Sequence, residues 1–365
     1  MSNIRSKRIK KVLSIVVITL VILLILFVVA AAMLFRNYLA KIDYDHGDLH
    51  NMHQTESVLS DEEIQKELLE EEADTGESDS PEEIISQLEA QMEQQQKVDG
   101  EELESDLFHI LLVGSDSRKQ GGAGRSDTMI LVSVNEETEK IHMTSILRDC
   151  YVSIPKRGNN RINAAYAFGG GGLLLDTIET NFAVDVDKYV AFDFYSFVDA
   201  VDSLGGIEID VSEEEIPVLN EYVKELNKLN GRAEQEYYVT QAGPQQLNGT
   251  QALGYARIRY VGNGDFQRTE RQRMVIQKLF EKAKTMNLLE LNDLLNVLLP
   301  KIKTNLTEGE IVALMFKVMT YLKYDLESFR LPVDGSYTHM RVNGMSVLGI
   351  DLKKNQEALA EFVNE

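Results

Sequence analysis

The sequence contains a single cysteine, Cys150, which excludes an internal disulfide and a metal site built from several cysteines. Its six histidines show neither HxH nor HExxH spacing, so no zinc site is predicted. The segments SDSR and GRSD do not match the GxSxG nucleophile elbow, and no GxxxxGK(S/T) phosphate loop occurs. Because no histidine lies near Cys150 in the sequence, we interpret it as a small buried residue rather than a nucleophile.

Charged residues are also missing from the stretch 12–35, which is long enough to cross a hydrocarbon core of ~30 Å. Five basic residues precede this stretch, whereas Arg36 and Lys41 are the only cations soon after it. That asymmetry predicts a short basic cytoplasmic tail over 1–11, a single-pass signal anchor over 12–35 and an extracytoplasmic remainder. The alanines at 30–32 keep a cleaved signal peptide as the alternative, but the length of the run favours a retained anchor.

An acidic segment follows. From Glu56 to Asp106, 20 acidic residues stand against two lysines, a net charge of −18 in a chain whose net charge is −22. Helical spacing over 62–74 and 82–96 leaves a short coiled coil open, but the density of like charges favours a solvated segment. We therefore predict that 36–105 is a largely disordered acidic stalk, which we expect anionic lipid to repel.

The remaining residues, 106–365, suffice for one α/β domain. Strands interleaved with helices predict a three-layer α/β/α sandwich with a mixed central sheet, preceded by the one transmembrane helix. Four successive glycines at 169–172 indicate a flexible turn. The expected strands are 108–114, 128–135, 140–146, 188–194, 207–211 and 252–261, with short ones near Phe329 and Val347. The expected helices are 172–182, 195–206, 266–286, 288–299 and 307–322, and a short helix at 249–253 is left open before the last long strand.

Ten of the sixteen arginines fall into two parts of the chain, 114–170 and 255–273. Arginine is the side chain best matched to phosphate oxygens, since its planar fork donates two parallel hydrogen bonds and stays charged. If 252–261 is a strand, Arg257 and Arg259 project from one face, and three polar residues align on one side of the next helix. Those three residues are Arg268, Arg271 and Gln272. The pattern predicts a pyrophosphate site, with structural salt bridges to Asp116, Asp127, Asp149 and Glu270 as the alternative.

Aspartates lie among these arginines. Asp116 directly follows a predicted buried strand, and Asp127 directly precedes the next one. Two carboxylates at neighbouring strand ends could share one Mg²⁺ ion, which prefers oxygen ligands. Asp265 stands where a helix is expected to begin, so it is either an N-cap or a residue that holds Arg257 or Arg259 in place.

Several motifs resemble the LytR-CpsA-Psr family. They occur in that family's order over about 106–285: GSDSR, GRSDTMILVSVN, SILRDCYVSIP, RINAAYAFGG, DFYSFVDAVDSLGGIEIDV, LNGTQALGYARIR and GDFQRTERQRMVI. Two positions depart from the family pattern. Leu147 stands where proline is common, and Cys150 stands where threonine or serine is common. Neither change removes a charged group, so we expect an altered local backbone rather than lost chemistry.

The resemblance implies an enzyme of the Gram-positive cell envelope. It would transfer an anionic glycopolymer, such as teichoic acid or capsular polysaccharide, from an undecaprenyl pyrophosphate carrier to peptidoglycan through a phosphodiester bond. Its implied partners are that lipid-linked polymer, peptidoglycan and membrane lipid. A hydrophobic tunnel for the polyprenyl chain is also implied, which draws attention to the apolar stretch from Leu173 to Phe197.

The resemblance also assigns residues. Asp116 and Asp127 would bind Mg²⁺, with Mn²⁺ as an alternative, and Asp116 is the candidate general base. Asp116, Arg148, Arg257 and Arg259 would carry catalysis. The pyrophosphate set comprises Arg125, Arg148, Arg257, Arg259, Arg268, Arg271 and Gln272, to which we add Arg118 and Asp265.

Two alternative functions remain open. Water as the acceptor would make the same site a polyprenyl pyrophosphate phosphatase. A non-enzymatic membrane-anchored regulator, such as a transcriptional attenuator, is the other. Direct contact with nucleic acid is not expected, because the cytoplasmic part is about eleven residues and the outer domain has no net positive charge.

Overall fold

A computed structural model describes residues 39–45, 78–96, 107–115 and 124–365. The chain separates into a unit of residues 1–42, of which only 39–42 are described, and a unit of residues 43–365. The predicted tail and the predicted span over 12–35 lie outside the described residues. Within the described ranges, no helix combines the length and the apolar character needed to cross a bilayer.

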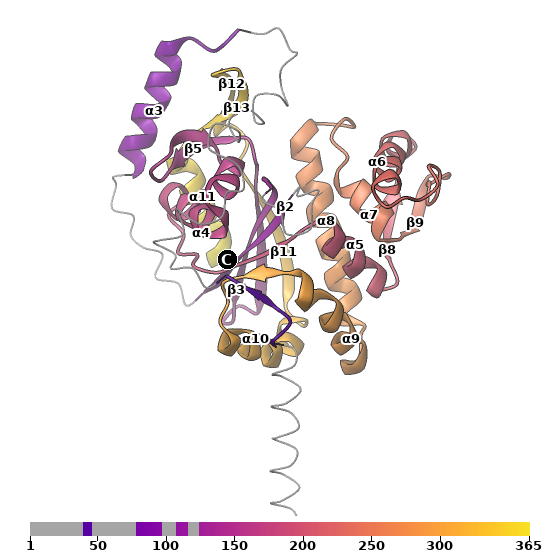
Figure 1. The fold of residues 1–365 in the computed structure, drawn as a ribbon. Helices are drawn as coiled ribbons and strands as arrows, with labels where there is room; N and C mark the ends of the chain where they lie inside the picture. The colour runs from indigo at the N-terminus through magenta and orange to yellow at the C-terminus, as the bar shows by residue number, and fades with distance from the viewer. Residues whose placement is uncertain (1–38, 46–77, 97–106, 116–123) are drawn as a thin grey trace, which may run out of the picture. The chain divides into compact units, whose positions relative to one another are not determined.

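The larger unit is built on a mixed sheet (Figure 1). Over the described residues its order is β1-β10-β7-β2-β3-β4-β11, with β1 (Asp43–Tyr44), β2 (Phe108–Ser115), β3 (Ser126–Asn135), β4 (Lys140–Ile146), β7 (Tyr189–Phe192), β10 (Lys303–Thr304) and β11 (Asp325–Leu331). The β3–β4 pair is antiparallel, which confirms the predicted hairpin. Strand β2 runs antiparallel to β3 but parallel to β7, so the sheet is mixed, as predicted.

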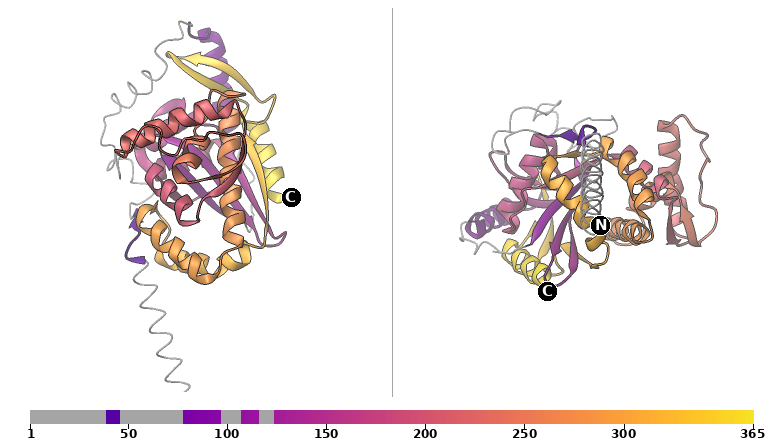
Figure 2. Two further views of the ribbon diagram at one scale, coloured as in Figure 1. Left: turned by 90° about the vertical axis from the view of Figure 1, so that its right-hand side faces the viewer. Right: turned by 90° about the horizontal axis from the view of Figure 1, so that it is seen from below.

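The two faces of the sheet carry different structures. Leu111 and Val113 of β2 are fully buried in the main core, against which α4 (Asn163–Phe182) and α11 (Leu352–Asn364) pack. Successive strand side chains point to opposite faces, so Leu112 and Gly114 face the other way. They line a cavity on the face covered by α5 (Phe194–Ser203), α7 (Gly249–Ala256), α8 (Gly264–Lys284) and α9 (Leu288–Leu298) (Figures 1 and 2).

Two smaller sheets adjoin the central one. One has the order β12-β13-β5-β6, with β12 (Tyr337–Val342), β13 (Met345–Ile350), β5 (Cys150–Ile154) and β6 (Gly158–Arg161). The other pairs β8 (Ile207–Val211) with β9 (Gly243–Leu247), beside α6 (Glu215–Leu229). The strand predicted at 207–211 is therefore confirmed, but it pairs outside the central sheet. Neither α6 nor the C-terminal helix α11 was predicted from the sequence.

The predicted stalk is partly wrong. Residues 82–96 form a helix, α3 (Glu82–Gln96), that packs on the domain instead of standing in solvent. Met92 is only 1% exposed, and Leu88 lies against Gly349 of β13. The hydroxyl of Tyr151 donates a hydrogen bond to Glu89 at 2.8 Å. Apolar residues on one face of the helix thus outweigh its acidic composition, and the domain boundary predicted at 106 moves toward the N-terminus.

The strand predicted at 252–261 is also wrong. Residues Gly249–Ala256 form the helix α7, and no strand follows within 257–261. Asn248 caps this helix: its side chain accepts from the amide of Gln251, and the Gln251 side chain accepts from the amide of Asn248, each at 2.9 Å. This capping box satisfies two orphan amide donors and starts a helix where the β-branched and aromatic residues suggest a strand.

The glycine run at 169–172 forms a kink inside α4 rather than a turn between elements. Gly170 has a φ of +64°, which favours glycine. A Cβ on Gly171 would lie 2.3 Å from the ring of Tyr189, so the helix approaches β7 closely at this point. The other predicted helices, at 266–286, 288–299 and 307–322, are confirmed as α8, α9 and α10 (Glu308–Tyr321).

Candidate functional site

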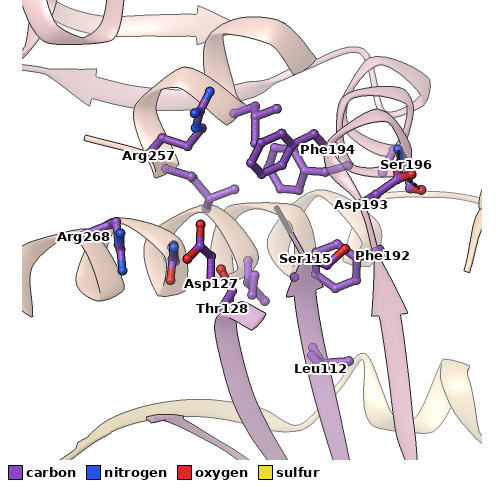
Figure 3. A pocket seen from close by; sticks show the side chains of 18 of the residues that line it. Leu112, Ser115, Asp127, Thr128, Phe192, Asp193, Phe194, Ser196, Arg257 and Arg268 are labelled. Carbon is purple, nitrogen blue, oxygen red and sulfur yellow. Dashed lines mark hydrogen bonds between the residues drawn. The ribbon is translucent and has the colours of Figure 1, made fainter. Parts of the chain in front are cut away.

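A cavity of about 440 Å³ lies between the central sheet and helices α5, α7, α8 and α9 (Figure 3). Most of its wall is apolar. Strands β2 and β7 contribute Leu112, Val190 and Phe192 from the sheet side, and the helices and the segment after α9 contribute Phe194, Phe197, Ala200, Leu253, Ala256, Val275, Ile276, Leu279, Leu298 and Ile302. Such a wall suits a hydrocarbon chain better than a polar substrate.

Charged residues gather at one part of the same cavity. Arg148, Arg257, Arg259 and Arg268 all line it, as do Asp127 and Gln272. Figure 3 shows Asp127, at the edge of the sheet, between Arg268 on α8 and the β2 strand. The two arginine-rich parts of the sequence therefore meet at one site.

Asp127 and Arg148 form the closest ion pair of this site, at 2.7 Å between Oδ1 and Nη1. Arg148 is 4% exposed. Burial alone would raise the pKa of the Asp127 carboxyl, but Arg148, Arg268 and Arg125 outweigh burial and lower it. Asp127 is therefore held as a carboxylate.

Two further carboxyl groups, those of Asp149 and Asp265, contact the arginines. Nε of Arg148 is 3.6 Å from Asp149 and 3.9 Å from Asp265. Asp265 also binds Arg268 at 2.9 Å and Arg259 at 3.2 Å, while Asp149 lies 3.5 Å from Arg161. Asn263 occupies the N-cap position of α8. The contacts of Asp265 therefore favour the second of its two predicted roles, which is to hold an arginine in place. That arginine is Arg259 rather than Arg257.

Asp149 and Asp265 also hydrogen-bond each other. Burial is the main cause that raises the pKa of Asp149 to about 6. Burial opposes ionisation of Asp265 as well, but Arg268 and the hydrogen bond from Asp149 lower its pKa to about 2. The pair therefore holds one proton in mildly acidic solution and releases it near neutrality.

The guanidinium of Arg257 packs against two aromatic rings. Its guanidinium carbon lies 4.9 Å from the ring centre of Phe194 and 4.7 Å from that of Tyr222. One of its terminal nitrogens lies 3.1 Å from Glu225, while Nη1 is buried with no hydrogen-bond partner among the described residues. Cation–π contacts stabilise the cation without using its hydrogen-bond donors, so Arg257 retains a donor for a ligand.

Arg271 lies outside the cavity, although the sequence places it one helical turn from Arg268. It is 3% exposed and does not line the cavity. Its Nε donates to Glu215 of α6 at 2.8 Å, and its terminal nitrogens donate to the carbonyls of Ile258 and Val261 at 3.2 Å. We therefore leave Arg271 out of the phosphate-binding set that we propose below.

The remaining predicted residues are only partly described. Arg125 lies near enough to lower the pKa of Asp127, but it does not line the cavity. Asp116 and Arg118 lie outside the described residues; Ser115, which precedes Asp116, lines the cavity. The metal prediction therefore rests here on Asp127, and the described residues contain no group of three histidines, cysteines or acidic residues able to hold a metal ion.

The apolar stretch from Leu173 to Phe197 is divided between the main core and the cavity, a division that the sequence analysis did not make. Leu173, Leu174 and Leu175 are fully buried in the main core, whereas Phe192, Phe194 and Phe197 line the cavity. Asp149 was predicted only as a salt-bridge partner of the arginines, and its contact with Arg148 confirms that role. Arg161 and Tyr222 were missed. Arg161 lies within an arginine-rich window, whereas Tyr222 lies on a helix that no pattern predicted.

The two unusual positions have structural explanations. The amide of Leu147 donates to the carbonyl of Leu331 at 3.0 Å, a bond that proline could not make. Cys150 is fully buried, and burial raises the pKa of its thiol far above the usual range. This confirms Cys150 as an inert buried residue.

Comparison with known proteins gives consistent relatives. Regulatory protein MsrR of Staphylococcus aureus (strain COL) is 31% identical over 260 residues, which cover 70% of this chain and 74% of MsrR. The polyisoprenyl-teichoic acid–peptidoglycan teichoic acid transferase TagU of Bacillus licheniformis is 36% identical over 205 residues, 55% of this chain and 61% of TagU.

Solved structures share the fold. TagT bound to LI-WTA is 27% identical, with a TM-score of 0.56 over 74% of this chain and 94% of TagT. The structure of YwtF (TagT) with bound octaprenyl pyrophosphate lipid is 26% identical, with a TM-score of 0.53 over 74% of this chain and 95% of YwtF. The sequence pattern of the LytR_cpsA_psr family matches residues 71–362, well over half of the chain. This protein belongs to the LytR_cpsA_psr family.

Proposed function

We propose that this chain transfers an anionic glycopolymer from a polyprenyl pyrophosphate carrier to peptidoglycan. One observation carries the proposal: the wall of a mostly apolar cavity includes a cluster of arginines. A polyprenyl chain would occupy the apolar part, and its pyrophosphate would lie among Arg148, Arg257, Arg259 and Arg268. The relatives named for teichoic acid transfer and for bound octaprenyl pyrophosphate support this assignment.

The charges of the site suit a pyrophosphate diester. The described residues of the site bring six guanidiniums near four carboxyl groups, which leaves two positive charges when all of them are ionised. The guanidiniums are Arg125, Arg148, Arg161, Arg257, Arg259 and Arg268, and the carboxyl groups are Asp127, Asp149, Asp265 and Glu225. A pyrophosphate joined to a lipid and to a sugar carries two negative charges near neutral pH, so it suits a site in which guanidiniums outnumber carboxyl groups.

The reaction is a phosphoryl transfer. A hydroxyl group of peptidoglycan, which we assign to C6 of N-acetylmuramic acid, attacks the sugar-linked phosphorus. A bond forms from the hydroxyl oxygen to phosphorus, and the bond from phosphorus to the bridging oxygen breaks. Polyprenyl phosphate leaves with that electron pair, and a phosphodiester joins polymer and wall. Positioning and neutralisation of charge on the phosphate oxygens carry such reactions, and the arginines supply both.

Asp127 has the chemistry expected of a Mg²⁺ ligand, because the arginines keep it ionised and Mg²⁺ is commonly held by one or two carboxylates plus substrate phosphates. We propose Asp116 as its second ligand. When bound, the ion would withdraw negative charge from the phosphate oxygens. The same lowered pKa makes Asp127 a weak base, so we retain Asp116 as the candidate that accepts the proton of the attacking hydroxyl.

A transfer assay tests this function. The full chain in detergent is given polyprenyl pyrophosphate-linked glycopolymer and peptidoglycan, and the polymer joined to peptidoglycan is measured. We expect transfer by the wild type and by Arg232→Ala, which removes an exposed arginine outside the cavity, and loss of transfer in Arg259→Ala. No transfer by the wild type would contradict the proposed function, and equal transfer by all three proteins would contradict the role given to Arg259.

The same assay separates the two alternatives. Release of free glycosyl phosphate in the presence of peptidoglycan, with no attached polymer, would identify a phosphatase that uses water. The MsrR relatives are named regulatory proteins, which keeps a regulatory role as a second candidate. Binding of the lipid-linked substrate with neither transfer nor hydrolysis would favour that role.

A further inference from the structure

Helices α9 and α10 expose large apolar side chains to solvent. Leu289 on α9 is 76% exposed, and on α10 Phe316 is 71% and Met319 is 42% exposed. Ile311 is the only residue of α10 that is buried, although the helix is rich in apolar residues. We call Leu289, Phe316 and Met319 the α9–α10 surface.

This exposure is costly for an isolated domain. Burying a Leu or Phe side chain stabilises a protein by ~1.5–3 kcal/mol relative to leaving it exposed. Large apolar side chains exposed on two consecutive helices indicate that this region contacts another apolar environment. Figures 1 and 2 place α9 and α10 at the end of the larger unit where β10 lies.

The short segment between the predicted membrane span and β1 indicates that this apolar environment is the lipid bilayer. The predicted span ends at residue 35, and β1 begins at Asp43 and pairs with β10. The intervening residues, 36–42, can reach at most about 25 Å even when fully extended. Strand β10 lies between α9 and α10 in the chain, with only the short turn η2 (Leu299–Lys301) and a loop beside it. If the span is in place, this end of the domain lies close to the bilayer surface.

The charge of the region permits that contact. From Leu288 to Lys323 the chain has four lysines and four acidic residues, so this stretch has no net charge, whereas the whole chain is −22. Anionic lipid that repels the acidic segment would not repel this surface. The expectation that the acidic residues hold the whole domain away from the bilayer therefore does not extend to α9 and α10.

We propose that the α9–α10 surface rests on the outer leaflet of the membrane, with Leu289 and Phe316 inserted among the lipid acyl chains. Leu298 at the end of α9 and Ile302 after η2 line the cavity. If the function proposed above is correct, a polyprenyl chain would pass from the bilayer into the cavity along this end of the domain. The membrane contact itself does not depend on that function.

The absence of tryptophan from the chain allows a direct test. Leu289→Trp, Phe316→Trp and Leu229→Trp each give the full chain one tryptophan. Leu229 is a matched control, because it is 48% exposed but lies at the end of α6, far along the chain from α9 and α10. Each protein is reconstituted into vesicles of phosphatidylcholine and phosphatidylglycerol, with or without bromine on the acyl chains, and tryptophan emission is recorded.

We expect the emission of Trp at 289 and 316 to shift to shorter wavelength and to be quenched by the brominated lipid, whereas Trp at 229 is unchanged. Unquenched emission at all three positions would overturn the proposal. Quenching of all three to the same extent would also overturn it, because contact would not be specific to this surface. A blue shift without quenching would indicate a protein partner, such as a second copy of the chain, instead of lipid. These outcomes require no turnover, so failure of the transfer assay would not affect them.

Discussion

Two buried arginine clusters lie a single helical turn apart on α8, yet they are built differently. Around Arg271, one carboxylate and two backbone carbonyls satisfy the guanidinium, and the cluster is closed. Around Arg268, several guanidiniums converge on fewer carboxyl groups, and they line a cavity. A buried arginine saturated by protein acceptors stabilises the fold, whereas an arginine cluster with surplus charge beside a cavity is prepared for an anion.

The largest expected effect is on catalysis at the open cluster. Arg148→Ala should lower the rate of polymer transfer by ~10³-fold or more, because an arginine that stabilises transferring phosphate oxygens is worth about that much. The rate constant at saturating substrate is the measurement. Arg148→Lys keeps the charge but loses the planar fork, so its rate should fall between wild type and Arg148→Ala. An Arg148→Ala enzyme with the wild-type rate would contradict the claim that the cluster around Arg268 serves the reaction.

The closed cluster should instead affect stability. Arg271→Met should lower the free energy of unfolding by about 3–5 kcal/mol, because it leaves the buried Glu215 carboxylate without its partner. Chemical denaturation measures this change. The double variant Arg271→Met with Glu215→Leu should recover much of the loss, and both variants should still bind polyprenyl pyrophosphate while folded. Lost lipid binding in a folded Arg271→Met protein would place this arginine in the site.

Filling the apolar cavity should have a smaller effect, and it should depend on the length of the lipid. Ala200→Phe places a ring where a polyprenyl chain would lie, so the ring occupies volume that a long chain needs. We expect weaker binding of a long-chain polyprenyl pyrophosphate and unchanged binding of a short-chain one, measured by calorimetry. An equal loss for both lipids would show that the ring disturbs the arginines rather than the chain site.

The smallest effect is a pH dependence from Asp149. Its pKa in the folded protein, about 6, lies above the ordinary value, so the folded state favours the protonated form. The stability that this proton contributes is present at low pH and is lost as the pH rises through about 6. Asp149→Asn should therefore gain less stability than wild type when the pH falls from about 7 to about 5. Identical pH profiles in thermal unfolding would contradict this account of the Asp149–Asp265 pair.

The sequence predicts the sheet of this protein better than it predicts the packing around it. Alternating and continuous apolar runs correctly give β2, the β3–β4 hairpin and β7, because strand burial leaves a local pattern. Only the first part of α7, over 249–253, was anticipated, because its capping box at Asn248 and Gln251 competes with a β-like composition in the residues that follow. Helical spacing over 82–96 was recognised, but acidic composition led to the prediction of a solvated segment, whereas α3 packs on the domain and buries Met92.

In the site, too, local features were predicted from the sequence and contacts between distant segments were not. The concentration of arginine in two parts of the sequence anticipates the cluster of Arg148, Arg257, Arg259 and Arg268 at one cavity, although the strand spacing inferred for Arg257 and Arg259 is wrong. Periodicity also groups Arg271 with Arg268, but it cannot reveal that α6 supplies Glu215 as a partner from 56 residues away. Likewise, the shared proton of Asp149 and Asp265 depends on burial and on contacts between distant segments, neither of which the sequence states.

The measurement that tests the central claim most directly is mass spectrometry of the lipid that co-purifies with the full chain in detergent. Wild type, Arg148→Ala and the control Arg232→Ala are compared at equal protein amounts. A cavity that binds a polyprenyl chain and an arginine cluster that binds its phosphate predict a polyprenyl phosphate or pyrophosphate in wild type and in Arg232→Ala, and its loss in Arg148→Ala. No such lipid in any of the three, together with no binding of added polyprenyl pyrophosphate, would contradict the account.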